Sequence, residues 1–244
     1  MAKWQWYQNP RTGIWYRTRP DDWLLHNRLT HRSSGYQVQT QRFVRQYFQD
    51  RPARTAIDAG AHTGMTAVAY SGIFERVLAF EPIPELYEQA EMTIAKNRCS
   101  NVELHAYGLG AETTETHFKY LPTSSFATHR NRKGTITAQI RCIDDLRIDS
   151  VDFIKIDVEG MEAEVIQGAW QTITDNEPLI QFEYKPKFAR QQNNDIEQMC
   201  AALEKRNYEI QDKRGCARAD SKMCDLFALP KNPLTTPPAI AYNK

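Results

Sequence analysis

The chain has 244 residues, enough for one well-buried α/β domain with an extension but short for two full domains. Its net charge is +1, with 25% charged and 41% apolar residues, so the overall composition does not point to a polyanionic partner. No stretch approaches the roughly 18 apolar residues that a membrane span needs, and the start lacks the apolar centre of a signal peptide. We therefore expect a cytoplasmic protein, and the sequence leaves its oligomeric state open.

The positive charge is concentrated at the start of the chain. Residues 1–54 carry ten Lys or Arg and three Asp or Glu, a net of +7, so the remainder carries −6 against the total of +1. The five cysteines are scattered and none forms a C-x-x-C pair, which favours free thiols over a disulfide framework or a zinc site. We expect three parts: a basic extension or lid (1–35), one α/β domain (36–230) and a Pro-rich tail (231–244).

Residues 1–35 combine tryptophans with arginines and show no regular period, so we expect an irregular extension. Such a segment can stack bases and bind phosphates, or it can pack on the domain as a lid with Arg stems over indole rings. We favour the lid, because no aromatic platform repeats and the rest of the chain is acidic. The side chains concerned are Trp4, Trp6, Trp15, Trp23, Arg11, Arg17, Arg19 and Arg28.

From residue 36 onward, short apolar runs alternate with amphipathic stretches, which is typical of a parallel, doubly wound sheet. We expect strands at 55–59, 76–80, 102–107, 151–156, 178–184, 208–211 and 224–229. We expect helices at 36–49, 63–70, 84–97, from Met161 onward, and across Ile196 to Leu203. Residues 108–142 interrupt this alternation with polar turns between alternating segments, which predicts a β excursion with a mobile tip.

Two motifs at strand ends point to a nucleoside. In IDAGAHTG (57–64) a strand meets two glycines and then a helix, so Gly60 lets backbone approach a ligand and Gly64 permits close packing. A tight turn in any α/β protein needs such glycines, so this motif alone is weak. In AFEP (79–82) the acidic Glu81 ends the next strand, where it can accept hydrogen bonds from both ribose hydroxyls.

The third motif is FIKIDVEGMEAEVIQGA (153–169), in which acidic residues follow a buried strand. Helix capping explains one or two of them. It explains less easily why Asp157 and Glu159 occur together beside Lys155. Carboxylates at the carboxyl end of a central strand lie at the crevice where open α/β sheets bind ligands, so we favour a functional role.

These three motifs, in this order, resemble the FkbM-type methyltransferase family, as do the loop TSSF (123–126) and the strand LIQFEY (179–184). The resemblance covers about residues 36–211. It implies a Rossmann-like class I methyltransferase fold, with a central, mostly parallel seven-stranded sheet and helices on both faces. It also implies binding of S-adenosylmethionine (SAM) by Asp58, Gly60 and Glu81, with Asp157 beside the methyl-transfer centre. His62 stands where the family's glycine turn usually has Asn.

The full set of candidate SAM-binding residues is Asp58, Gly60, His62, Thr63, Gly64, Glu81, Pro82, Gly108 and Asp157. The candidate substrate-binding residues lie in the 108–142 segment and are Ser124, Ser125, His129 and Arg130. Transfer of a methyl group to a hydroxyl needs proximity and a base or metal to remove the proton, and our candidates are Asp157, Glu159 and Glu183. The same three carboxylates can hold Mg²⁺, which prefers oxygen ligands. His62, His105, His117 and His129 are further base candidates.

The leading hypothesis is O-methylation of a hydroxyl on a sugar or other small molecule. The alternative within enzymes is a nucleic-acid methyltransferase that uses the N-terminal Trp and Arg residues, although no N-P-P-Y motif for a flipped amino base is present. The alternative outside enzymes is a SAM-binding protein without turnover.

Overall fold

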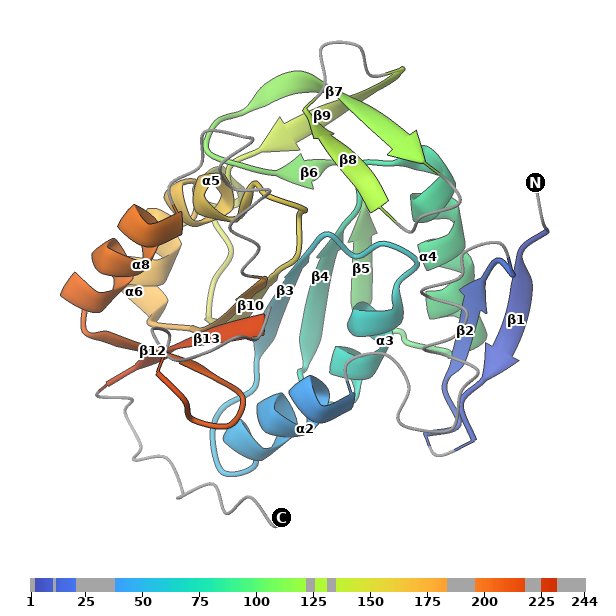
Figure 1. Ribbon diagram of the computed structural model, residues 1–244. Helices are drawn as coiled ribbons and strands as arrows, with labels where there is room; N and C mark the ends of the chain where they lie inside the picture. The colour runs from blue at the N-terminus through green and yellow to red at the C-terminus, as the bar shows by residue number, and fades with distance from the viewer. Residues whose placement is uncertain are drawn as a thin grey trace.

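The computed structural model describes residues 3–10, 12–20, 38–121, 126–130, 135–183, 196–217 and 225–231. Its centre is a seven-stranded sheet in the order β12-β13-β11-β10-β3-β4-β5 (Figure 1). The strands are β3 (Thr55–Ala59), β4 (Arg76–Phe80), β5 (Val102–His105), β10 (Val151–Ile156), β11 (Leu179–Glu183), β12 (Tyr208–Asp212) and β13 (Asp225–Pro230). In this sheet β13 runs opposite to the other six strands, which are parallel to one another. The expected mostly parallel, seven-stranded sheet is therefore confirmed.

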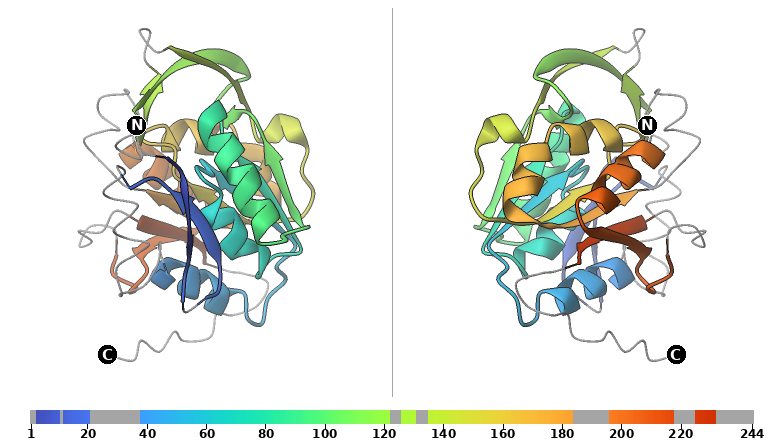
Figure 2. Two further views of the ribbon diagram at one scale, coloured as in Figure 1. Left: turned by 90° about the vertical axis from the view of Figure 1, so that its right-hand side faces the viewer. Right: turned by 90° about the vertical axis from the view of Figure 1, so that its left-hand side faces the viewer.

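Helices cover both faces of the sheet, as the two views of Figure 2 show. One buried cluster joins residues of α2 (Val38–Tyr47) and α3 (Met65–Ser71) to Ala56 and Phe153 of the sheet. A second joins residues of α5 (Glu162–Gln167), α6 (Trp170–Asn176) and α8 (Ile196–Lys205) to Ile57 and Ile154. Successive strand residues thus pack on opposite faces, which explains why the strands read as unbroken apolar runs.

The helix expected from Met161 onward is divided in two. Gly168 ends α5, and a Cβ on it would lie 1.9 Å from the carbonyl oxygen of Gly110. The chain then starts α6 at Trp170. The prediction of a single helix was wrong because this close backbone contact is made by a segment far away in the sequence.

The chain reverses its winding direction between β3 and β10. From β3 it proceeds to β4 and β5 on one side, and later to β10 and β11 on the other. The connections at the carboxyl ends of these two neighbouring strands therefore leave in opposite directions, which creates the ligand crevice typical of open α/β sheets. The register pairs Lys155 of β10 with Asp58 of β3.

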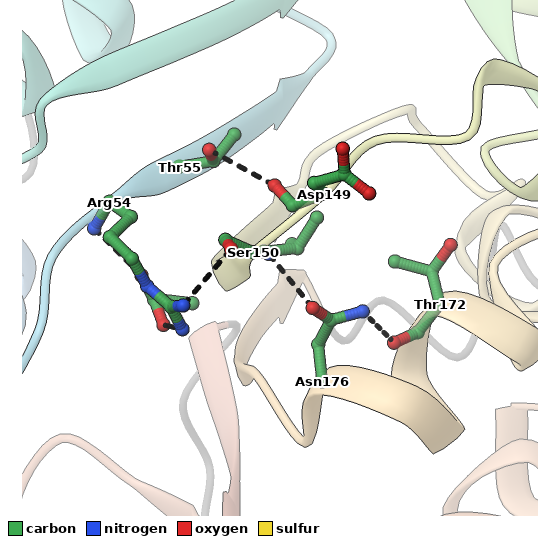
Figure 3. A network of polar contacts seen from close by, with 8 residues as sticks. Arg54, Thr55, Asp149, Ser150, Thr172 and Asn176 are labelled. Atoms are coloured by element: carbon green, nitrogen blue, oxygen red, sulfur yellow. Dashed lines mark hydrogen bonds and ion pairs between the residues drawn. The ribbon is translucent and has the colours of Figure 1, made fainter.

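Polar contacts at the opposite, amino ends of these strands hold that register (Figure 3). The Arg54 guanidinium lies 2.7 Å from the Asp152 carboxylate, and it also donates to Ser150 Oγ at 3.0 Å. The backbone N–H of Val151 donates to Asn176 Oδ1 at 3.1 Å, which ties α6 to the start of β10.

A second, four-stranded sheet lies in the chain between β5 and β10. Its order is β6-β9-β7-β8, and it lies across the carboxyl ends of the main sheet (Figures 1 and 2). Its strands are β6 (Gly108–Leu109), β7 (Thr114–Leu121), β8 (Phe126–Arg130) and β9 (Ile136–Arg141), followed by the 3-10 helix η1 (Asp144–Leu146). The expected β excursion is confirmed, while its turns at 122–125 and 131–134 lie outside the described residues.

The N-terminal segment forms an antiparallel hairpin of β1 (Gln5–Gln8) and β2 (Trp15–Thr18). It lies along α4 (Pro84–Lys96), as both figures show. The expectation of an irregular extension is therefore wrong for these residues. Gly13, at φ 71°, lets the chain turn back, and its N–H donates to the Asn9 carbonyl at 2.8 Å.

The expected domain boundaries near residues 35 and 230 stay predictions, because residues 21–37 and 232–244 lie outside the described part. Among the helices that the structure describes, none is both long and apolar enough to span a membrane.

Candidate active site

The glycine turn after β3 is held between β10 and α4. Gly60 and Gly64 both have φ 81°, a left-handed conformation that glycine adopts without steric cost. A Cβ on Gly60 would lie 2.0 Å from the carbonyl oxygen of Asp157, and one on Gly64 would lie 3.1 Å from Ala90 in α4. The predicted close packing at Gly64 is confirmed. At Gly60 the close approach is to the backbone of Asp157.

A buried lysine connects the turn to the end of β10. Lys155 Nζ donates to the Gly60 carbonyl at 2.8 Å and lies 2.9 Å from Asp58 Oδ1 and 3.9 Å from Asp157 Oδ2. Burial lowers the pKa of Lys155, but the carboxylates of Asp58 and Asp157 together raise it by more than burial lowers it. The net shift of the pKa is therefore upward. The amine is therefore a permanent positive charge beneath the crevice.

Asp58 is completely buried, and its other oxygen accepts a hydrogen bond from Thr66 Oγ1 at 2.6 Å. Its carboxylate thus supports the turn from below. Our sequence reasoning noted Lys155 but gave it no role. The signal was present, because a lysine within an otherwise buried apolar strand must find a partner for its charge.

Glu81 follows β4 and closes the other side of the turn. Its carboxylate accepts hydrogen bonds from the backbone N–H of His62 at 2.8 Å and of Ile83 at 2.9 Å. Burial raises the pKa of Glu81 to about 7, although the two N–H donors act in the opposite direction. A carboxylate accepts up to about four hydrogen bonds, so Glu81 keeps capacity for donors such as ribose hydroxyls. A nucleoside cofactor therefore fits this position.

His62 adopts φ 52°, a left-handed conformation in which Asn, Asp and His are enriched among residues other than glycine. This backbone requirement accounts for either Asn or His at the position. The contact that the turn makes with Glu81 comes from the His62 backbone N–H, which every residue except proline supplies.

Three predicted acidic residues converge at the ends of β10 and β11. Asp157, Glu159 and Glu183 are half-buried, and each offers a carboxylate oxygen within 4.8 Å of the others. The turn between them is sharp, since Glu159 has φ 55° and Gly160 has φ 102°. The fold therefore brings together the three residues that we expected to act as base or metal ligands.

Glu162 stabilises this turn, because its Oε1 accepts a hydrogen bond from the Gly160 N–H at 3.0 Å. It is 3% exposed, and burial raises its pKa to about 7. Glu162 belongs to the acidic motif at 153–169, and its role in the structure is to hold the turn at Gly160.

The remaining candidates lie around these groups. Thr63 is buried in the turn, and Pro82 is half-buried. A Cβ on Gly108 would lie 2.7 Å from Ile140 and 3.4 Å from Pro82, so the second sheet packs against the segment after Glu81. Ser124 and Ser125 lie outside the described residues, as do the side chains of His129 and Arg130 in β8.

Sequence reasoning missed a group of rings at the carboxyl ends of β4 and β5. Phe80 stacks on His105, with ring centroids 4.9 Å apart, and lies 5.4 Å from Tyr107. Arg141 of β9 lies over the Tyr107 ring at 4.4 Å. Burial lowers the pKa of His105. His117 lies elsewhere, on β7, where its Nδ1 is 3.0 Å from Thr137 Oγ1.

A seven-stranded sheet with one antiparallel strand, a glycine turn after its first strand and an acid after its second defines the Rossmann-like methyltransferase fold. Within that class, the chain belongs to the methyltransferase FkbM domain family, which matches residues 58–210. The expectation drawn from the three motifs is confirmed.

Two known proteins are similar to this chain. The chain is 28% identical over 116 residues to the hexuronic acid methyltransferase AglP of Haloferax volcanii, and the match covers 46% of this chain and 48% of that protein. It is similar in fold to the crystal structure of a methyltransferase FkbM from Methylobacillus flagellatus KT, with a TM-score of 0.50 and 21% identity. That match covers 86% of this chain and 58% of the other. The chain thus spans about half the length of both relatives.

The buried ion pair yields a stability prediction. We expect Lys155→Met to lower the free energy of unfolding by about 3–5 kcal/mol, because it leaves the buried Asp58 carboxylate without its counter-charge. The double variant Asp58→Asn/Lys155→Met should cost less than the single variant, since neither charge remains. Urea unfolding of both variants measures the coupling.

The matched control is Arg76→Met. It breaks an ion pair with Glu103 in which both side chains are about half exposed, at 47% and 49%. Such pairs contribute about 0–1 kcal/mol. If Lys155→Met costs no more than Arg76→Met, the Lys155 pair does not stabilise the crevice.

Proposed function

We propose that this protein is a SAM-dependent O-methyltransferase that acts on a sugar. The observation that carries the proposal is the pairing of a nucleoside-type acid, Glu81, with a converging group of three carboxylates at the same edge of one sheet. Membership of the FkbM domain family supports methyl transfer. The similarity to a hexuronic acid methyltransferase supports a sugar acceptor.

On the donor side, Glu81 would accept hydrogen bonds from the ribose hydroxyls, and the backbone of the 60–64 turn would hold the remainder of the cofactor. Asp58 and Lys155 hold that turn from below and need not contact the cofactor. SAM supplies an electrophilic methyl group on a sulfonium. A crevice that contains several carboxylates suits this cation electrostatically.

On the acceptor side, the acceptor oxygen would take the methyl group from bound SAM, and the electron pair of the broken carbon–sulfur bond would stay on sulfur. A hydroxyl acceptor loses its proton in this step, and one of Asp157, Glu159 and Glu183 takes it. Ser124, Ser125, His129 and Arg130 remain our candidates for holding the acceptor. The three acids equally have the oxygen atoms that Mg²⁺ requires.

The raised pKa of Glu81 predicts a pH dependence of cofactor binding. The ionised carboxylate accepts hydroxyl hydrogen bonds better than the protonated form, so the affinity should increase as pH increases through about 7. We expect the dissociation constant of S-adenosylhomocysteine (SAH) to fall about tenfold from pH 6 to pH 8. Isothermal titration calorimetry measures it.

Two variants test whether Glu81 causes the pH dependence of SAH binding. Glu81→Gln should remove most of it and weaken binding. Glu162→Gln should retain it, although burial raises the pKa of Glu162 to about 7 as well. Equal slopes in the wild type and in Glu81→Gln would show that another group causes the effect. Absence of SAH binding at any pH would exclude the SAM site.

The group of three acids, Asp157, Glu159 and Glu183, yields a prediction about methyl transfer. We expect Asp157→Asn to lower kcat for a hydroxyl acceptor by about 10²–10⁴-fold. Asp149→Asn is the matched control, because Asp149 is an exposed acid at the opposite end of β10. Activity of Asp157→Asn equal to that of Asp149→Asn would exclude Asp157 as the base and leave Glu159 and Glu183.

Chelation separates the two roles of these acids. Activity that persists in EDTA supports the role of these acids as the base that takes the proton. Loss of activity that Mg²⁺ restores assigns Asp157, Glu159 and Glu183 as metal ligands instead.

The acceptor is tested with radiolabelled SAM and three substrates: a hexuronic-acid oligosaccharide, the corresponding neutral oligosaccharide and an RNA. We expect methylation of a sugar. Mild alkali then distinguishes the acceptor atom, because a methyl ester on a carboxylate is hydrolysed whereas a methyl ether on a hydroxyl is stable. A label on RNA alone would favour a nucleic-acid methyltransferase, and SAH binding without any transfer would favour a protein that only binds SAM.

The N-terminal residues give little support to the nucleic-acid alternative. Arg17 lies 5.2 Å from the Trp6 ring, and Lys96 of α4 lies 4.9 Å from the Trp15 ring. These rings are thus engaged with cations of the same chain.

A further inference from the structure

The N-terminal hairpin contacts the beginnings of two helices, and each of these helices directly follows a segment that we assign to the cofactor. Its strand β2 packs along α4, and Tyr16 of β2 also reaches α3. Helix α3 follows the 60–64 turn, and α4 follows Glu81. One small element of the fold therefore connects both halves of the proposed cofactor site.

The contact with α3 is apolar. Tyr16 is 2% exposed and Met65 is 3% exposed, and the two pack together beside Ile14. Met65 is the first residue of α3 and directly follows Gly64. Displacement of Tyr16 therefore removes the packing on one side of the glycine turn.

The contact with α4 is polar and charged. Arg19 is 2% exposed, and its Nη1 lies 3.4 Å from Glu85 Oε1. Trp4 Nε1 donates to the same oxygen at 3.2 Å, and the Arg19 guanidinium lies 5.8 Å from the Trp4 ring. Arg19 is buried while the Glu85 side chain is 38% exposed, and this contact holds the first turn of α4 against the hairpin.

Trp4 extends this contact towards Glu81. It packs against the buried cluster that contains Ile83, Leu86 and Ile140. The backbone N–H of Ile83 donates to Glu81 Oε1 at 2.9 Å. Trp4 and Ile83 thus connect the hairpin to the acid that we propose to bind the ribose.

We propose that the β1–β2 hairpin is a clamp that fixes the glycine turn and the Glu81 segment relative to each other, with Trp4, Tyr16 and Arg19 as positioning residues. This inference rests on the proposed function. A site that is already ordered before binding avoids the entropy loss of ordering its loops, so the clamp increases cofactor affinity without contacting the cofactor.

The same hairpin provides a control at the other end of α4. Asn97, the C-cap of α4, accepts a hydrogen bond from the Trp15 N–H at 2.8 Å and donates one to the Trp15 carbonyl at 2.7 Å. Helix α4 has 13 residues, so this contact lies about 20 Å from the first turn of the helix. Asn97→Ala therefore weakens hairpin docking at the end of α4 opposite Glu85, which makes it the control for Arg19→Met.

The experiment compares Arg19→Met, Tyr16→Ala and Asn97→Ala by calorimetry with SAH and by thermal unfolding. We expect Arg19→Met and Tyr16→Ala to raise the dissociation constant of SAH about 5- to 30-fold. Asn97→Ala should change it less than about twofold at a comparable loss of thermal stability. Arg19→Lys, which keeps the charge, should recover part of the affinity. Equal dissociation constants across all variants would overturn the proposal.

Hydrogen exchange without ligand gives an independent readout. We expect faster exchange of the amides at 60–64 and of Glu81, Ile83 and Glu85 in Arg19→Met than in Asn97→Ala. If the wild-type protein binds no SAH, the proposed function fails, and this exchange comparison alone decides whether the clamp exists. Unchanged exchange in these segments excludes it. Where Tyr16→Ala does not fold, Tyr16→Leu tests the same contact with less loss of volume.

Discussion

The buried ion pair between Lys155 and Asp58 is the interaction on which the crevice depends. Each partner belongs to one of the two central strands from which the chain winds in opposite directions. The lysine also donates to the Gly60 carbonyl, so a single amine holds the strand pair and the glycine turn together. Its charge is fully removed from water, and only a correct strand register satisfies it. The network at the amino ends of the same strands, around Arg54, holds that register from the other side.

This arrangement leads to a site in which acids outnumber bases. Lys155 is surrounded by Asp58, Asp157 and, further away, Glu81, and its pKa is raised accordingly. Burial raises the pKa of Glu81 to about 7. The site therefore combines one permanently charged group that supports the backbone with one acid that titrates near neutral pH.

Much of the fold was predictable from local sequence. Strands β3, β4 and β10 lie at the expected residues, because short runs of buried apolar residues bounded by glycine, proline or polar residues leave little freedom for their ends. The break between α5 and α6 was not predictable, since Gly168 ends the helix against the backbone of Gly110. The N-terminal hairpin was also missed. Its residues pack on α4 and show no alternation of their own that would reveal a strand.

The sequence by itself determined the family, the positions of the strands along the chain and the residue types at their ends. These follow from local periodicity and from three short motifs. The tertiary structure alone decided what those residues do. Asp58 forms an ion pair with Lys155, and the Asp157 carbonyl fills the space beside Gly60. Glu183, at the end of β11, lies close to Glu159, which follows β10. Each of these contacts joins segments far apart in the chain, and their distances depend on strand register and helix packing, which no local pattern encodes.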